Sequence, residues 1–161
     1  METYKSRLEA AKQRIRRDMA QEITSEFKSI AEAHGFTTPR TELNLDYEQI
    51  VVDFLADPID GVAETFSIIC DEETTRFDAY FGESVNGEPS EPIKEMYGAP
   101  VLTWKVLIKR VPRFLDKLTI TCQTCEGDGQ IYENEDSDET VECPRCHGAG
   151  EILRSQRRQA A

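Results

Sequence analysis

The amino-acid sequence predicts an α+β fold in which a long N-terminal helix and a second helix lie on a small antiparallel sheet. Three observations support this prediction. The N-terminal region carries one apolar stripe with helical spacing, the middle contains short segments of alternating apolar and polar residues, and the C-terminal region repeats a phrase with paired cysteines. A chain of 161 residues is long enough for one domain, or for one domain and a small module.

Residues 3–34 are predicted to form one helix, because apolar side chains recur every three or four positions. The stripe consists of Tyr4, Leu8, Ala11, Ile15, Met19, Ile23, Phe27, Ile30 and, at its end, His34. Its spacing disfavours a long left-handed coiled coil, and Gly35 is placed to end the helix. Such a helix spans roughly 45 Å. Either its first half projects from the body or packs on a partner, or the whole stripe packs on its own domain.

A second helix is predicted to start at Asp46, after a short strand at 41–45. Asp46 and Gln49 have the spacing of a capping box. Five apolar residues then follow a helical pattern, namely Tyr47, Ile50, Val51, Phe54 and Leu55. Asp57-Pro58 is expected to end this helix.

The next segments predict strands. Residues 62–70 and 76–82 alternate apolar with polar side chains and are separated by a polar turn. Residues 82–92 are expected to form a polar loop, and residues 93–98 a turn or short helix. A third strand is predicted within residues 100–110, where Leu102, Trp104, Val106 and Ile108 occupy every second position and alternate with residues that include Thr103, Lys105 and Lys109.

Four of the five cysteines lie in a repeated phrase. Residues 122–129 and 143–150 both read Cys-x-x-Cys-x-Gly-x-Gly. Zinc prefers four tetrahedral sulfur ligands, and the 17 residues between Cys125 and Cys143 allow a hairpin that brings the pairs together. The glycines suit the sharp turns that follow each pair. We therefore predict one structural zinc ion held by Cys122, Cys125, Cys143 and Cys146.

The repeated phrase resembles the cysteine-rich zinc finger of DnaJ-type (Hsp40) chaperones. Those chaperones carry four such units and two zinc ions, whereas this chain has two units, which implies a half-finger with one zinc. The resemblance covers about 30 of the 161 residues. The J domain with its His-Pro-Asp signature is absent, so the resemblance does not imply an Hsp70 co-chaperone. Two-unit fingers also occur in small regulatory proteins similar to anti-TRAP, where the zinc module helps to bind another protein.

The charge distribution limits the partners that this chain can bind. Its net charge is −12. Residues 1–40 contribute +2 (8 basic, 6 acidic), residues 41–150 contribute −16 (8 basic, 24 acidic), and residues 151–161 contribute +2 (3 basic, 1 acidic). An acidic body repels phosphate backbones, so nucleic acid is an unlikely partner of the finger. Residues 133–140 are acidic at five of eight positions, and this hairpin tip is either a solvated loop or a docking patch for a basic surface.

No apolar run is long enough for a membrane span, and the N-terminus lacks the apolar region of a secretory signal. The expected location is therefore the cytoplasm, or the host cytoplasm if the protein is encoded by a virus.

Residues 1–118 are expected to form the body, residues 119–153 the finger, and residues 154–161 a flexible tail or a frayed helix.

Other candidate site residues have structural explanations. His147 is expected to be exposed, because four cysteines already complete the metal site. His34 is expected to interact with the dipole at a helix end, and Cys70 to be a buried small hydrophobe. The basic run in the first helix is expected to be a solvated face or, less favourably, a phosphate contact; it comprises Lys12, Arg14, Arg16 and Arg17.

These observations favour a non-enzymatic adaptor that binds another protein through its zinc finger and its N-terminal stripe, with regulation or chaperone-like binding as its role. The N-terminal helix also offers a route to oligomerisation. Three alternatives remain open: an accessory component of a larger assembly such as a phage particle, a thiol–disulfide oxidoreductase that uses the Cys-x-x-Cys pairs, and a nucleic-acid-associated regulator that uses the basic chain ends.

Overall fold

The computed structural model describes residues 4–44, 48–59, 61–74, 76–85, 88–100, 104–133 and 139–160. The chain divides into two compact units, Met1–Arg113 and Phe114–Ala161. The architecture is α+β, as predicted, with a long N-terminal helix, an antiparallel sheet and a C-terminal region that contains the cysteine cluster. None of the helices among the described residues is long and apolar enough to cross a membrane.

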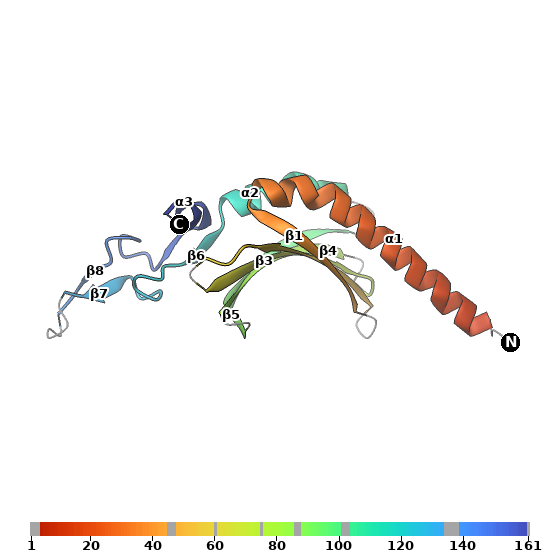
Figure 1. Ribbon diagram of the computed structural model, residues 1–161, viewed down its shortest axis with the longest axis horizontal. Helices are drawn as coiled ribbons and strands as arrows, with labels where there is room; N and C mark the ends of the chain where they lie inside the picture. Colours follow the sequence, from red (N-terminus) through yellow and green to blue (C-terminus); the bar gives the residue numbers. More distant parts are fainter. Residues whose placement is uncertain are drawn as a thin grey trace. The chain divides into compact units, whose positions relative to one another are not determined.

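The first unit contains the long helix α1 (Tyr4–Ala33) and five antiparallel strands (Figure 1). The strands are β1 (Phe36–Asn44), β2 (Gln49–Ala56), β3 (Val62–Asp71), β4 (Arg76–Val85) and β5 (Glu88–Pro100). They follow one another in the sheet in the order of the chain, and α1 packs on β1 and β2. Figure 1 shows α1 and the helix α2 (Trp104–Asp116) on the same side of this sheet. The boundary between the two units falls inside α2, after Arg113.

Helix α1 confirms the long N-terminal helix that the stripe predicts. The side chains that it buries all lie in its second part, and they are Arg16, Ala20, Ile23, Phe27 and Ala31. Gly35 ends the helix at a φ of 82°, a left-handed conformation that glycine adopts without steric cost. The backbone N–H of Gly35 donates to the carbonyl of Glu32 at 3.0 Å and so satisfies one of the last carbonyls of the helix.

The face of the sheet that α1 contacts forms the core of the first unit. Alternate residues of β2, β3 and β4 point to this face and are buried. Phe66 on β3 lies at its centre, with ring centroids 5.8 Å from Phe36 and 5.9 Å from Phe54. Phe36 also meets Phe81 on β4 at 6.4 Å. The strands predicted at 62–70 and 76–82 are confirmed by β3 and β4.

The second helix predicted from Asp46 is wrong where the structure describes it, because residues 49–56 form strand β2. Its buried residues alternate strictly along the strand, in the order Ile50, Val52, Phe54 and Ala56. Consecutive apolar residues at 50–52 and 54–56 satisfy a helical pattern as well as an alternating one, and pairing with β1 and β3 decides in favour of the strand. The proposed capping residue Asp46 and the neighbouring Tyr47 lie outside the described residues.

Two further expectations are corrected. Apart from residues 86–87, which lie outside the described residues, the predicted polar loop at 82–92 and turn at 93–98 belong to the end of β4 and to β5, which is an edge strand. An edge strand tolerates proline and charged residues, because its outer backbone groups face solvent. The third strand predicted within 100–110 is helix α2 over the described residues, and its buried positions Leu107, Val111 and Leu115 recur every four residues. Leu102, which that prediction included, lies outside the described residues.

The second unit is built from two small antiparallel ribbons. Strand β6 (Thr119–Thr121) pairs with β9 (Glu151–Leu153), and strand β7 (Gln130–Tyr132) pairs with β8 (Thr140–Glu142). The last described residues form the short helix α3 (Arg154–Ala160), where the sequence predicts a frayed helix or a flexible tail. Its first backbone N–H, on Arg154, donates to the carbonyl of Leu118 at 2.9 Å.

Candidate metal centre

The four repeated cysteines converge between the two ribbons of the second unit. Cys122 follows β6 directly, and Cys143 follows β8 directly. The antiparallel pairing of β6 with β9 and of β7 with β8 brings the two Cys-x-x-Cys turns to face each other. All four sulfur atoms lie within 4.8 Å of one another, and all four residues are buried, with at most 6% of their surface exposed.

The spacing of the sulfur atoms fits a tetrahedral zinc ion. The Sγ atoms of Cys122 and Cys143 are 3.9 Å apart, and those of Cys125 and Cys146 are 3.7 Å apart. Zinc–sulfur bonds of about 2.3 Å in a regular tetrahedron place two sulfurs about 3.8 Å apart. The cluster therefore has the geometry of a site for one metal ion, and its all-sulfur donor set is the one that structural zinc prefers. When bound, the ion supplies a crosslink between the two halves of the unit.

The two Cys-x-x-Cys turns have matching hydrogen bonds. The N–H of Cys122 donates to the carbonyl of Gly150, and the N–H of Cys143 donates to the carbonyl of Gly129, both at 2.8 Å. Each turn also aims a glycine N–H at its second sulfur: Gly129 donates to Cys125 Sγ and Gly150 donates to Cys146 Sγ, both at 3.3 Å. Such N–H donors favour the thiolate form that a metal requires. The pattern explains why the phrase repeats its glycines as well as its cysteines.

The glycines of the two turns approach each other too closely for side chains. A Cβ added to Gly129 would overlap the backbone carbonyl of Gly148, and a Cβ added to Gly150 would overlap that of Gly127. All four of these residues also have positive φ angles, between 74° and 96°. The predicted need for glycine is therefore twofold, because it comes from turn conformation and from the approach of the opposite turn.

The four thiols influence one another's ionisation. Burial disfavours the Cys143 thiolate, but hydrogen bonds from the backbone of Cys146 and Arg145, together with neighbouring thiols, outweigh it and lower its pKa to about 7. Burial and contacts with the other thiols raise the pKa of Cys146 to about 11, although the Gly150 N–H opposes this. Thiols this close cannot all become negative without a compensating cation. A divalent ion at the centre of the cluster would hold all four as thiolates.

The remaining candidates from the sequence take no part in this centre. His147 is exposed at a turn position with a φ of 51°. The Nδ1 atom of His34 lies 2.8 Å from the carbonyl oxygen of Ile30, one turn earlier in α1. Cys70 is buried on the core face of β3, and burial raises the pKa of its thiol to about 11, which makes it an unreactive hydrophobe.

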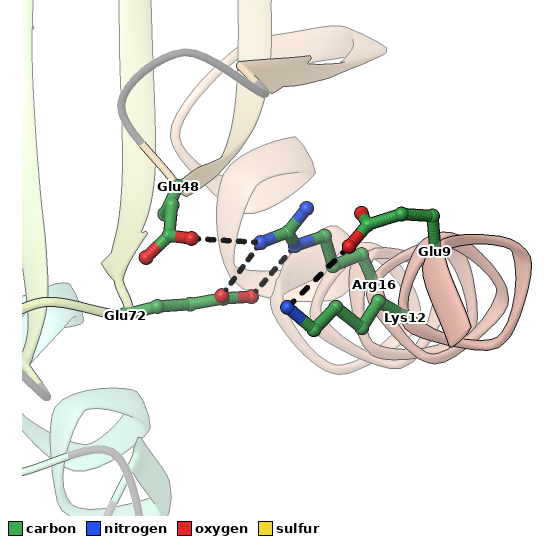
Figure 2. A network of polar contacts seen from close by, with 5 residues as sticks. All are labelled: Glu9, Lys12, Arg16, Glu48 and Glu72. Carbon is green, nitrogen blue, oxygen red and sulfur yellow. Dashed lines mark hydrogen bonds and ion pairs between the residues drawn. The ribbon is translucent and has the colours of Figure 1, made fainter. Parts of the chain in front are cut away.

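The basic run of α1 contains one residue that is not solvated. Arg16 is buried and forms two hydrogen bonds to the carboxylate of Glu72, at 2.9 and 2.8 Å (Figure 2). Glu48 lies 4.0 Å from the same guanidinium, and Lys12 pairs with Glu9 nearby. The expectation of a fully solvated basic face is therefore wrong for Arg16. Its partner is 56 positions away, in the turn that follows β3, so no local pattern in the sequence could reveal it.

Comparison with protein-family models, with curated proteins and with solved structures finds no match for this chain. The cysteine cluster thus supports a metal-binding module, whereas its assignment to the DnaJ type depends on the repeated phrase alone. The acidic hairpin tip that the sequence singles out has residues 134–138 outside the described residues.

Proposed function

We propose that this protein is a non-enzymatic adaptor, in which a DnaJ-like zinc finger with four cysteine ligands presents the β7–β8 ribbon to another protein. The observation that carries this proposal is the contrast between the two parts of the finger. The four sulfurs are enclosed, while Tyr132 at the end of β7 exposes 69% of its surface. Val141 on β8 is also exposed, on the other face of the ribbon. Exposed aromatic residues such as tyrosine are enriched in protein-binding surfaces.

The charges beside these side chains indicate the kind of partner. Glu142 lies on the same face of the ribbon as Tyr132, and Glu133 and Glu139 adjoin the ends of the two strands. The described part of this ribbon carries no basic residue. A complementary partner would present an apolar pocket bordered by lysine or arginine. The zinc ion would act at a distance, by fixing the turns from which the two strands of the ribbon extend.

The closed arrangement of the sulfurs favours this function over thiol–disulfide exchange. An exchange reaction begins with attack by an accessible thiolate. Here each sulfur belongs to a buried cysteine, and the donor set is complete for a tetrahedral ion. Zinc content and insulin reduction, measured on the same preparation, separate the two functions. We expect one tightly bound zinc per chain and no reductase activity. Reductase activity that changes when zinc is removed or added would instead favour the thiol–disulfide oxidoreductase.

Binding is tested by affinity capture from the native cell with three baits: the unaltered chain, Tyr132→Ala and Cys122→Ser. A specific partner should be retained by the unaltered chain and lost with both variants, although Tyr132→Ala keeps its zinc. Gln123→Ala, which changes an exposed polar residue of the second unit outside the β7–β8 ribbon, is the matched control. A partner that both Tyr132→Ala and Cys122→Ser capture as well as the unaltered chain would contradict the proposal.

A further inference from the structure

The first part of α1 carries an apolar stripe that its own unit does not cover. We call residues 4–15 the overhang, because they precede Arg16, the first buried residue of α1. Figure 1 shows that the N-terminal end of α1 extends past the sheet. Tyr4 exposes 84% of its surface and Ile15 exposes 60%, and Leu8 between them is exposed as well. Three large apolar side chains in a row on one helix form a surface that favours a partner.

The direction of the stripe explains why the overhang cannot use its own sheet. In an α-helix each step of four residues turns a position by about 40° around the axis. The stripe passes from Ile15 to Phe27 in three such steps, and it therefore turns by about 120°. Phe27 faces the covered side of the sheet and is fully buried, so Ile15 and the residues before it face another direction.

The charges beside the stripe exclude the simplest partner, which is the same stripe of a second chain. With 3.6 residues per turn, Lys5 and Lys12 border the stripe on one side, and Arg7 and Arg14 border it on the other. The overhang carries four basic residues and one acidic residue, a net charge of +3. Two such helices packed stripe to stripe would oppose like charges on both flanks. The surface that fits the overhang is apolar and acidic.

The face of the sheet opposite to the one that α1 contacts is both apolar and acidic. We call it the open face. It is half-exposed along β2, β3 and β4. Val51 lies opposite Ile69, and Tyr80 lies opposite Ser67, which places apolar side chains on adjacent strands. The described charged residues of this face are Glu42, Asp53, Asp71, Asp78, Glu95, Arg40 and Arg76, five acidic and two basic, with a net charge of −3.

The contact that α1 already makes with this sheet also combines apolar packing with pairing of basic and acidic side chains. Ile23 and Phe27 cover apolar side chains of the core face, and Arg16 beside them pairs with Glu72 in the turn after β3. The overhang is about 18 Å long, and five strands at the usual spacing are about 19 Å wide. One overhang can thus lie across the sheet without exceeding its width.

We propose that the overhang of one copy docks on the open face of a second copy, and that the second copy returns the same contact. Reciprocal docking gives a dimer with two-fold symmetry, in which both overhangs and both open faces are covered. It also doubles the area that a single short helix could bury, which brings the interface toward the size of stable dimers. The inference does not depend on the zinc finger or on its proposed partner.

The mass in solution, measured by sedimentation equilibrium over a range of concentrations, tests the dimer. We expect a mass twice that of one chain at high concentration, and weaker dimerisation when salt is raised. Leu8→Gln combined with Ile15→Gln keeps good helix formers and removes two apolar contacts, so the dimer should weaken on the order of a hundredfold or more. Ala10→Gln, at an exposed position on the other side of the overhang, is the control and should leave the dimer unchanged.

Charge reversal identifies the two surfaces. One variant carries Arg7→Glu and Arg14→Glu on the overhang, and the other carries Glu42→Lys and Glu95→Lys on the open face. All four residues are exposed, so the substitutions should leave the fold intact. Each variant alone should be monomeric because its overhang and its open face repel each other. Mixing them should restore a dimer, because both contacts in the mixed pair join opposite charges.

Three results would overturn the inference. One is an unaltered chain that stays monomeric at every concentration. Another is a mixture of the two charge variants that does not associate although each variant is folded. The last is a monomer whose overhang binds vesicles of phosphatidylserine, which would assign the basic amphipathic segment to an anionic membrane instead. Cys122→Ser should leave the dimer intact, and this separates the inference from the function of the finger.

Discussion

Replacing Gly129 by alanine should weaken zinc binding, although Gly129 is not a ligand. The residue has a φ of 75°, which costs about 1–2 kcal/mol for an L-residue. The new Cβ would overlap the carbonyl oxygen of Gly148 and lie 2.9 Å from the carbonyl carbon. Backbone atoms must move to relieve this contact, at a cost of about 1–3 kcal/mol. The sum is about 2–5 kcal/mol, and because metal binding and folding of such a unit are coupled, zinc affinity should fall roughly thirtyfold or more.

Gly127→Ala is the matched control for this effect. Its φ of 96° is also positive, but its Cβ would meet only the Cγ2 methyl group of Thr121, at 3.3 Å. A side-chain methyl can move where a backbone carbonyl cannot, so this variant should lose only the conformational part, about 1–2 kcal/mol. Competition with a chromogenic chelator at fixed pH measures both affinities. Equal zinc affinities for Gly129→Ala and Gly127→Ala would refute the idea that the opposite turn imposes the glycine.

Three other predictions concern the ligands, the ion pair and the core. Cys122→Ser should release zinc and loosen the second unit while the first unit stays folded, and a single global unfolding transition in circular dichroism would contradict this. Glu72→Gln should cost about 1 kcal/mol in urea unfolding at neutral pH, a modest value because the carboxylate is partly exposed, although Arg16 is buried. Arg16 lowers the pKa of Glu72 in the folded protein, so the ion pair contributes fully to stability above the usual glutamate pKa of about 4.3. This contribution disappears as the pH falls through the lowered pKa of the folded state. A stability difference between Glu72→Gln and the unaltered protein that grows in acid would contradict this. Phe66→Ala should cost about 3–5 kcal/mol in the same assay, and a loss below about 1 kcal/mol would show that the aromatic cluster is not the core.

The sequence predicts correctly those features whose pattern of residues lies within one continuous segment of the chain. The long helix α1 extends its stripe over many turns, and β3 and β4 alternate cleanly. The cysteine cluster is the clearest example, because Cys-x-x-Cys spacing with glycines indicates both which residues converge and where the chain turns. Arg16 could not be interpreted in the same way, since its ion pair is formed by residues that only the fold brings together.

The errors arise where two periodicities compete or where tertiary context decides. In β2 the apolar residues fit a helix and a strand equally well, and the neighbouring strands settle the outcome. In α2 the alternate positions Val106 and Ile108, flanked by Lys105 and Lys109, suggest a strand. The buried residues Leu107 and Val111 instead follow helical spacing. Pro112 lies inside this helix, where proline normally interrupts the hydrogen bonds, so local signals opposed the observed structure.

The close approach of the two Cys-x-x-Cys turns has a consequence for how this protein can change over time. The constraint on Gly129 originates at Gly148, and the constraint on Gly150 originates at Gly127. Neither turn can therefore accept a larger residue at this last glycine of its phrase on its own, even where its own ligands and hydrogen bonds would permit it. A mutation of Gly129 or Gly150 would persist only with a compensating shift in the other turn, so these two glycines should both be retained long after the sequence around them has diverged.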